Sequence, residues 1–340
     1  ANARGPVAPQ FEVDPFWPKP LPNDWVLGQV AGIEVDDQDR IWIVQRPGSL
    51  TAADLNGASP APPVMAFDVD GNLLEAWGPE AAEEGQEGPR EWAGCDWPIN
   101  EHGLWIDGDG NIWIAGNGGD DHIVLKFTSD GSSCLLQIGE WGVAGNNDSE
   151  DLLNRPADGD TDDAAREVYV ADGYGNNRVA VFDMDTGEFK RRHLAPDPEN
   201  DPWSTPVHCA VLSDDGLLYV CDRVNNRIHV LEKDGTFVEE LPIVPGTPGN
   251  GSAWDVSFSA DSAQEFLYNA DGYNQRVQIA RRNNLEAGLI AEFGRNGRYA
   301  GMFHWIHNID TDSRGNLYVA EVDEGKRTQK FDFRGLRPVG

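Results

Sequence analysis

Three histidines recur at equivalent places in a repeated sequence pattern. His102, His208 and His307 each open a short strand-like segment, and they lie 106 and 99 residues apart, about two repeat lengths each time. In a ring of repeats, equivalent positions of alternate units face one central axis from three sides. Three imidazoles that leave a fourth position open are the ligands of a catalytic zinc ion. The sequence therefore predicts a zinc site on these side chains, and the alternative is a metal-free channel in which they are hydrogen-bonded.

Short antiparallel strands must carry these histidines. Six segments repeat an apolar strand and a polar corner, as in Ile-Trp-Ile-Val-Gln-Arg at 41–46 and Leu-Tyr-Val-Cys-Asp-Arg at 218–223. Alternating aromatic and β-branched residues between Asp-Gly turns are typical of antiparallel strands, and four strands in about fifty residues are typical of a propeller blade. We expect an all-β, six-bladed β-propeller without a helix of any length. Its Asp…Asn-x-Arg corners predict an ion pair between second and third strands, through Arg178, Arg227 and Arg276.

The whole chain, 1–340, is expected to form one propeller domain. Residues 1–24 would be an N-terminal arm, in which 11–14 supplies the outer strand of the last blade and closes the ring. The expected blades are, approximately, 25–78, 102–140, 154–193, 205–242, 252–293 and 305–335. Two long segments, 47–62 and 79–101, interrupt the pattern and are candidate rims of a binding site.

The charge balance excludes two classes of partner. The chain has 26 Lys and Arg against 58 Asp and Glu, a net charge of -32, which repels nucleic acids and anionic membranes. It contains no run of 18 or more apolar residues that would span a membrane. The start of the sequence has no charged-then-apolar targeting segment, which leaves open a leader that has been removed.

Four cysteines bear on the compartment. Cys209 and Cys221 lie on either side of a turn at Asp215, and in a hairpin they would face each other closely enough for a disulfide. Cys95 and Cys134 would then form a second pair. The even count favours an oxidising compartment, secreted or periplasmic, and the alternative is that these are small buried thiols.

Three more polar side chains are expected at the mouth where the histidines meet. Arg46 ends the second strand of the first blade, and Tyr174 and Arg223 follow the second strands of the third and fourth blades. An arginine binds a carboxylate through two parallel hydrogen bonds, and a tyrosine beside a divalent cation can act as a base. We therefore expect a monomer that acts on a small molecule or peptide carrying a carboxylate.

The ordered set of these positions resembles the propeller of the peptidyl-α-hydroxyglycine α-amidating lyases, and the blade corners resemble NHL repeats. The likeness rests on the three histidines, on Arg46 and on two corners, Asp-Gly-Tyr-Gly-Asn-Asn-Arg at 172–178 and Asp-Arg-Val-Asn-Asn-Arg at 222–227. The resemblance implies a lyase that cleaves the C–N bond of an α-hydroxyglycine-type carbinolamide to an amide and glyoxylate. Zinc on the three histidines would bind the substrate hydroxyl, Tyr174 would take its proton, and Arg46 and Arg223 would hold the carboxylate.

Two features depart from that family. Its structural calcium site uses an acid directly after the last ligand histidine, where this sequence has Asn308, so calcium is left open as a second metal. Its partner activity, a copper monooxygenase, has no domain in this sequence. Two other functions stay open. One is a metal-dependent propeller hydrolase similar to the lactonases, which bind their metal through carboxylates and Asn. The other is a non-enzymatic NHL binding propeller.

Overall fold

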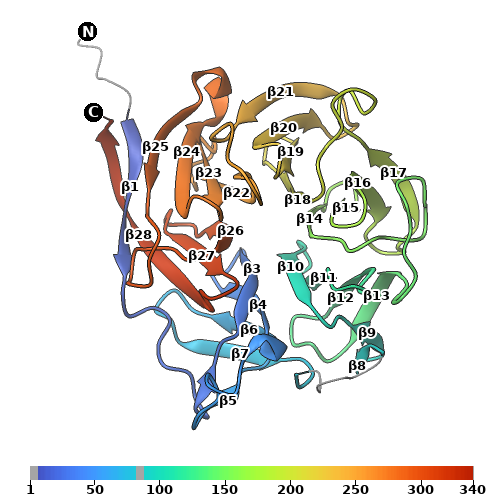
Figure 1. The fold of residues 1–340 in the computed structure, drawn as a ribbon, viewed down its shortest axis with the longest axis vertical. Helices are drawn as coiled ribbons and strands as arrows, with labels where there is room; N and C mark the ends of the chain where they lie inside the picture. Colours follow the sequence, from blue (N-terminus) through green and yellow to red (C-terminus); the bar gives the residue numbers. More distant parts are fainter. Residues whose placement is uncertain (1–6, 82–87, 340) are drawn as a thin grey trace.

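Six four-stranded antiparallel sheets surround a central axis in the computed structural model, which describes residues 7–81 and 88–339 (Figure 1). The all-β, six-bladed propeller expected from the repeats is confirmed. The described residues contain two short 3-10 segments, η1 (Pro47–Ser49) and η2 (Arg282–Ala287), and no α-helix. No helix in this part of the chain has the length and apolarity to cross a membrane.

The first three sheets run outward from the axis in chain order. The first contains β3 (Gln29–Val35), β4 (Ile41–Arg46), β6 (Val64–Phe67) and β7 (Leu73–Trp77). The second contains β10 (Glu101–Ile106), β11 (Ile112–Gly116), β12 (Ile123–Phe127) and β13 (Cys134–Gly139). The third contains β14 (Asp158–Asp162), β15 (Glu167–Asp172), β16 (Arg178–Asp183) and β17 (Phe189–His193).

The other three sheets complete the ring. The fourth contains β18 (Val207–Leu212), β19 (Leu217–Asp222), β20 (Arg227–Glu232) and β21 (Phe237–Pro242). The fifth contains β22 (Asp255–Phe258), β23 (Phe266–Asp271), β24 (Arg276–Arg281) and β25 (Leu289–Phe293). The sixth contains β26 (Ile306–Thr311), β27 (Leu317–Glu321), β28 (Arg327–Pro338) and, from the other end of the chain, β1 (Val7–Asp14).

The two segments expected as long loops carry short strands of their own. In one, β5 (Ser59–Pro60) pairs in parallel with β2 (Trp25–Val26). In the other, β8 (Arg90–Trp92) and β9 (Cys95–Trp97) form a small antiparallel hairpin. The turn of this hairpin is joined to the outer strand β13 by a backbone hydrogen bond from Cys134 N to the carbonyl of Ala93, at 3.2 Å.

Each sheet packs between two others, so its middle strands are buried on both faces. All residues of β11 and β12 are buried, which explains why these strands read as apolar runs and not as a strict alternation. Trp42, Trp97 and Phe127 fill the interface between the first and second sheets. Large aromatic side chains thus fill the wedge between neighbouring blades, where burial of apolar area stabilises the fold.

The predicted ion pairs hold the corners of the third and fourth sheets, and an equivalent pair that the sequence did not predict holds the corner of the sixth. In the third sheet Arg178 Nε lies 2.8 Å from Asp172, and both side chains are fully buried. Arg227 pairs with Asp222 in the fourth sheet, at 2.7 Å. In the sixth, Arg327 pairs with Glu321, also at 2.7 Å.

The expected corner role of Arg276 is wrong. Its guanidinium lies 2.9 Å from Glu292 on the outer strand β25. The corner acid Asp271 instead accepts hydrogen bonds from Asn274 and Gln278. In this corner the amides of Asn274 and Gln278 supply the hydrogen bonds that the guanidinium supplies in the other sheets.

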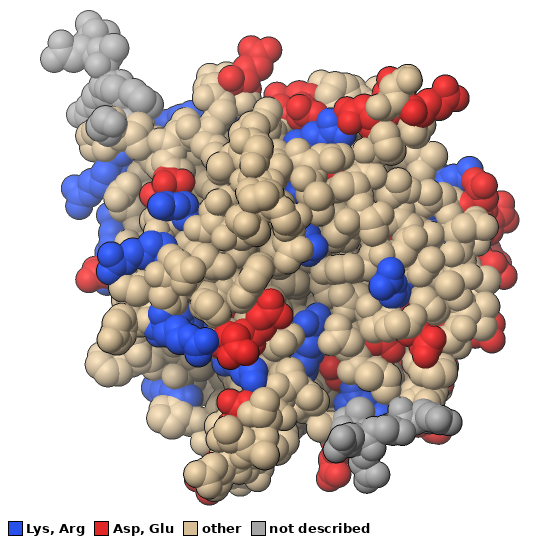
Figure 2. All heavy atoms as spheres, viewed as in Figure 1, with Lys and Arg blue, Asp and Glu red and all other residues tan. Residues whose placement is uncertain are grey.

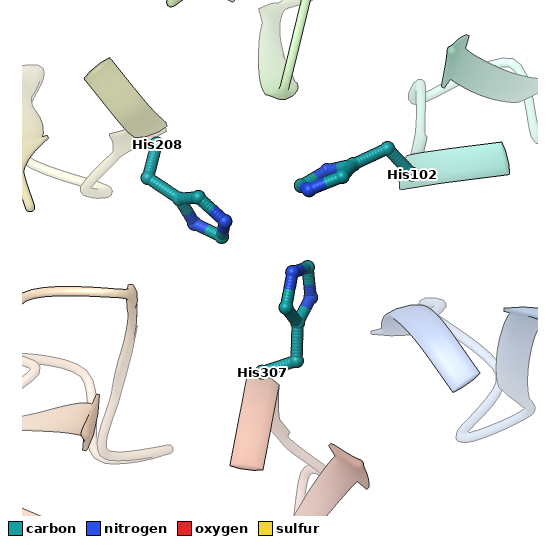
Figure 3. Close-up of side chains that lie close together, drawn as sticks. All are labelled: His102, His208 and His307. Carbon is teal, nitrogen blue, oxygen red and sulfur yellow. The ribbon is translucent and has the colours of Figure 1, made fainter. Parts of the chain in front are cut away.

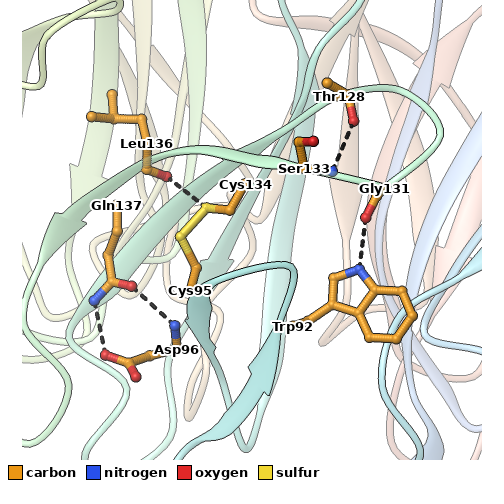
Figure 4. The surroundings of a disulfide bond; sticks show 9 residues. All are labelled: Trp92, Cys95, Asp96, Thr128, Gly131, Ser133, Cys134, Leu136 and Gln137. Carbon is orange, nitrogen blue, oxygen red and sulfur yellow. Dashed lines mark hydrogen bonds between the residues drawn. A yellow bond between two sulfur atoms is a disulfide. The ribbon is translucent and has the colours of Figure 1, made fainter.

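Both expected cysteine pairs are disulfide-bonded. Cys209–Cys221 links the two inner strands of the fourth sheet. Cys95–Cys134 ties the β8–β9 hairpin to the outer strand β13, beside a hydrogen bond from Trp92 to the carbonyl of Gly131 (Figure 4). Two disulfides in one chain indicate an oxidising environment.

Part of the negative charge is inside the ring. On the face seen in Figure 2, most acidic side chains lie toward the edge, and one acidic cluster lies near the middle beside several basic side chains. On the axis, a cavity of about 360 Å³ is lined by Glu34, Asp158, Asp160, Asp255 and Asp310. Desolvation and then mutual repulsion raise the pKa of each carboxyl, to about 7 for Asp160 and about 8 for Asp255.

The N-terminal strand β1 is the outermost strand of the sixth sheet. Its residues pair antiparallel with β28, from Val7 opposite Pro338 to Asp14 opposite Lys330. Phe11 of this strand packs among aromatic rings, with its ring centroid 5.5 Å from that of Tyr268 and 5.3 Å from that of Phe293. The paired strand is longer than the expected 11–14. That this segment keeps the ring closed stays a prediction.

We predict that Phe11→Ala lowers the free energy of unfolding by roughly 2 kcal/mol, because it removes an aromatic contact that joins the two ends of the chain. Phe16 is 83% exposed just beyond β1 and provides the control. Phe16→Ala should change stability by less than about 0.5 kcal/mol. Urea unfolding measures both, and equal effects would show that β1 adds nothing to the ring.

We predict that Glu34→Gln raises the melting temperature more at pH 8 than at pH 5. The pKa of Glu34 in the folded protein is well above its usual value, mainly through desolvation. The carboxyl therefore costs more stability as pH rises from its unfolded pKa toward its folded pKa. Glutamine does not ionise and avoids that cost. Glu75→Gln, at an exposed position of β7, should have no effect at either pH. A lower melting temperature at pH 8 for Glu34→Gln would contradict this account.

Candidate metal and substrate site

The three histidines converge on the axis from alternate sheets (Figure 3). His102 is in β10, His208 in β18 and His307 in β26, and each is at most 2% exposed. Their ring centroids lie 4.6 to 5.0 Å apart. The ligand nitrogens lie within 4.8 Å of one another, so the three side chains could hold one metal ion.

The hydrogen bonds of the histidine rings fit a metal. Each Nδ1 faces a backbone carbonyl of the next sheet: Ala157 at 2.8 Å from His102, Trp254 at 2.6 Å from His208, and Ala31 at 2.7 Å from His307. A carbonyl oxygen only accepts, so Nδ1 carries the proton and Nε2 carries the lone pair.

Of the three Nε2 atoms, that of His208 is buried and has no hydrogen-bond partner among the described residues. An unpaired buried acceptor costs free energy, and a metal ion would satisfy it. This arrangement, with Nδ1 held and Nε2 free, is typical of histidine metal ligands.

A β-bulge lies at each histidine. The register of β10 with β11 shifts between Glu101 and Leu104. Corresponding shifts occur between Val207 and Ala210 in β18 and between Ile306 and Ile309 in β26. A bulge re-aims side chains at the end of a strand. Of the inner strands that carry no ligand, β14 and β22 pair regularly, whereas β3 has a corresponding shift between Val30 and Gly32.

The histidines are neutral in the folded protein. Burial lowers the pKa of His102 and His208 well below the usual value, and that of His307 to about 3. Neighbouring positive charge adds to the effect, from Arg46 on His307 and from Arg223 on His208. Neutral imidazoles are the form that binds a metal.

Tyr174 and Arg223 lie directly beside the histidines. The Tyr174 hydroxyl is 3.0 Å from His102 Nε2 and accepts a hydrogen bond from Arg223 Nη1 at 3.1 Å. The guanidinium of Arg223 also lies 4.4 Å above the ring of Trp254, in cation–π geometry. Arg223 Nε is buried and has no partner among the residues described. The side chain is therefore held in place with donor capacity left over.

Arg46 approaches from the first sheet. Its Nε donates to the carbonyl of Glu101 at 2.6 Å, and its Nη1 donates to Gln29 at 2.7 Å. Glu101 directly precedes His102, so Arg46 is fixed next to the metal candidates. Burial lowers the pKa of Arg46 from its usual value, and the nearby Tyr174 and Glu101 oppose this effect.

Asn308 joins His307 to the axial carboxylate Asp158. Its side-chain oxygen contacts His307 Nδ1, and its amide nitrogen donates to Asp158 at 2.9 Å. The side chain thus orients a candidate ligand, and calcium gains no support from it.

Sequence reasoning missed the groups that orient the site. The carbonyl acceptors belong to Ala31, Ala157 and Trp254, which occupy the histidine position in the first, third and fifth sheets. A backbone carbonyl leaves no residue-type signal. The expected third-blade position was near Pro156, one residue away from the true acceptor. Trp254 is the one large residue among these three, but its residue type gives no sign of its contact with Arg223.

Comparison with known proteins places the chain near two kinds of propeller. It is 26% identical over 343 residues to NHL repeat-containing protein 3 of Mus musculus, covering 95% of this chain and 84% of that one. It is 24% identical over 238 residues to a probable peptidyl-α-hydroxyglycine α-amidating lyase of Caenorhabditis elegans, covering 66% of this chain. The match spans 62% of that relative's length. No protein-family model matches the chain.

Solved structures support the fold. Virginiamycin B lyase from Staphylococcus aureus superposes with a TM-score of 0.53 at 16% identity, covering 96% of this chain and 90% of that one. The chain is therefore a six-bladed β-propeller with homologues among the NHL repeat-containing proteins and the peptidyl-α-hydroxyglycine α-amidating lyases.

Proposed function

We propose that the protein is a zinc-dependent lyase that cleaves the C–N bond of an α-hydroxyglycine-type carbinolamide, giving an amide and glyoxylate. One observation carries the proposal. The three histidine Nε2 atoms, the Tyr174 hydroxyl and the Arg223 guanidinium meet at one point on the axis. The homologous lyase, whose printed name gives this substrate class, supports the choice of reaction.

The substrate would be held through its carboxylate. Arg46 and Arg223 approach the histidines from two sides, and they are the basic side chains that lower the pKa of His307. Each has a fixed guanidinium, through Glu101 and Gln29 for Arg46 and through Trp254 and Tyr174 for Arg223. A fixed guanidinium binds a carboxylate with little loss of entropy. Together they would place the hydroxyl-bearing carbon beside the histidines.

Tyr174 would then move the proton. The deprotonated oxygen of Tyr174 would take the proton of the carbinolamide hydroxyl, the C–N bond would break as the C–O bond becomes a carbonyl, and the Tyr174 hydroxyl so formed would return that proton to the amide nitrogen. Zinc bound to His102, His208 and His307 would supply a Lewis acid that stabilises the negative charge developing on the substrate oxygen. The two arginines would bind the carboxylate of the product glyoxylate until it dissociates.

A non-enzymatic binding propeller is the second candidate. The NHL repeat-containing relative is matched over 95% of this chain and 84% of its own length, and its name states repeats and no activity. A metal-loaded protein that turns over neither α-hydroxyglycine compounds nor lactones would favour this function over both the lyase and the lactonase-like hydrolase.

We predict that the purified wild type holds about one zinc ion per chain and that His208→Ala loses it, because two imidazoles bind zinc far more weakly than three. Elemental analysis after dialysis against zinc measures the content. His304, close in sequence to His307 and only partly buried, provides the control, and His304→Ala should keep its metal. Equal metal in wild type and His208→Ala would rule out the site.

We predict that Tyr174→Phe lowers the rate of glyoxylate release from an α-hydroxyglycine compound by about 10²- to 10⁴-fold while zinc content stays unchanged. The ring remains and the proton acceptor is lost. Tyr273, the 39% exposed counterpart in the fifth blade, provides the control. Tyr273→Phe should keep the wild-type rate. If Tyr174→Phe keeps it as well, the phenol is not the base.

A further inference from the structure

The residue directly before the first histidine, Glu101, is a buried acid. It is 1% exposed and begins β10. At the corresponding position, the other two sheets that carry a histidine have Val207 and Ile306, which are also buried. An aliphatic side chain therefore fits this place in the fold, whereas a carboxylate loses its hydration there. Packing alone does not account for an acid at this position.

Two side chains of the β8–β9 hairpin bind the carboxylate of Glu101. Arg90 Nη2 donates to Glu101 Oε1 at 2.6 Å, and Trp97 Nε1 donates to the same oxygen at 2.8 Å. Arg90 is itself only 7% exposed, so the ion pair is shielded from water. The hairpin is fixed to β13 by the disulfide Cys95–Cys134 (Figure 4). The partners of the acid therefore belong to an anchored segment.

The Arg90–Glu101 pair is better suited to fixing geometry than to adding stability. Removing two charges from water costs about as much free energy as their attraction returns, and apolar residues of similar volume often replace a buried ion pair without loss. A buried polar network whose members are all hydrogen-bonded is rigid, however, because any displacement leaves a charge without a partner. The pair therefore points to a part of the backbone that must be held in one position.

That part of the backbone holds the arginine of the first sheet. The carbonyl of Glu101 accepts the hydrogen bond from Arg46 Nε at 2.6 Å. The register of β10 with β11 shifts between Glu101 and Leu104, so the strand pairing is irregular next to this carbonyl. Among the described residues, no arginine donates to the carbonyls of Val207 or Ile306. The carbonyl that binds an arginine thus belongs to the residue with the buried acid.

Arg46 keeps one nitrogen for a ligand. Its Nε donates to Glu101 and its Nη1 to Gln29 at 2.7 Å, whereas Nη2 has no hydrogen bond to any residue that the structure describes. The side chain borders a cavity of about 710 Å³, whose lining also includes Ser49 and Asn100. The direction in which Nη2 points is therefore set by the two acceptors, and one of them is the carbonyl of Glu101.

We propose that Glu101 is a positioning residue for the carboxylate of the substrate. Its side chain, bound by Arg90 and Trp97, fixes the carbonyl that orients Arg46, and Arg46 binds the carboxylate. The inference rests on the proposed lyase function for the role of Arg46. It adds the β8–β9 hairpin to the parts of the protein on which substrate binding depends.

Binding without turnover tests this role. The probes are N-acetylglycine and N-acetylglycinamide, which lack the hydroxyl and differ in a carboxylate against an uncharged amide, titrated into the zinc-loaded full chain by calorimetry. We expect the wild type to bind the carboxylate on the order of tenfold more tightly than the amide. Glu101→Gln should lose most of this preference and keep its zinc, because Arg46 no longer has one fixed position.

A double variant separates positioning from folding. Glu101→Gln leaves the charge of Arg90 buried without its partner, which lowers stability. Arg90→Leu/Glu101→Val replaces the ion pair by apolar side chains, as at Val207, and should be about as stable as the wild type while the carboxylate preference is still lost. Asp107→Asn provides the control, because Asp107 forms a buried ion pair with Lys126 at 2.9 Å in the same blade. It should keep the preference.

A double-mutant cycle tests whether Glu101 acts through Arg46. Arg46→Ala should reduce the carboxylate preference by itself, and adding Glu101→Gln should reduce it no further. The inference is overturned if the wild type has no preference, or if Glu101→Gln and Arg90→Leu/Glu101→Val both keep it. It is also overturned if Glu101→Gln has the same effect with and without Arg46, or if Asp107→Asn loses the preference as well.

Turnover of N-acetyl-α-hydroxyglycine distinguishes this inference from the lyase function. Glu101→Gln should raise KM about tenfold and change kcat little, because the carboxylate is bound both before and during the reaction. If the wild type releases no glyoxylate while its carboxylate preference depends on Glu101, the lyase assignment fails and the positioning role stands. If glyoxylate is released with the same KM by wild type and Glu101→Gln, the lyase stands and the positioning role fails.

Discussion

The site depends on hydrogen bonds that cross from one blade to the next. Each candidate ligand donates from Nδ1 to a carbonyl in the following sheet, from His102 to Ala157, from His208 to Trp254 and from His307 to Ala31. The even blades supply imidazoles and the odd blades supply the acceptors that orient them. The imidazoles and the carbonyls are needed together, because the hydrogen bond to the carbonyl keeps the proton on Nδ1 and leaves the lone pair of Nε2 toward the axis.

This dependence makes the ring part of the site. The last of the three bonds joins β26 to β3, so it exists only when the sixth sheet packs against the first. The strand β1 adds to the sixth sheet and the disulfides tie down the second and fourth. Contacts outside the histidine cluster therefore help to keep three neutral imidazoles within reach of one ion.

The two ends of the central axis differ in the charge of the side chains that line them. The acidic cavity is lined by carboxylates from inner strands of both kinds. Asp310 follows His307 in β26, and the others come from the first, third and fifth sheets, which carry no histidine ligand: Glu34, Asp158, Asp160 and Asp255. A strand rises about 3.3 Å per residue, so residues a few positions after the histidines lie well below them along the axis. At the histidine end the charged neighbours are Arg46 and Arg223, and at the other end they are carboxylates with raised pKa values. An anionic substrate is thereby favoured at the mouth near the histidines and repelled beyond it.

The sequence by itself determined the number of blades and the three histidines, because strand alternation and a two-repeat spacing can both be recognised from the order of residue types along the chain. It also identified Arg46, Tyr174 and Arg223 as neighbours of that site, since strand ends of adjacent blades meet at one mouth. It misassigned Arg276, whose corner acid binds Gln278 instead, because several donors compete for one carboxylate. Only the tertiary structure decided the bulges at the histidines, the carbonyls that orient them and the cavity beside Arg46. These depend on backbone positions and on contacts between distant segments, and no single residue type encodes them.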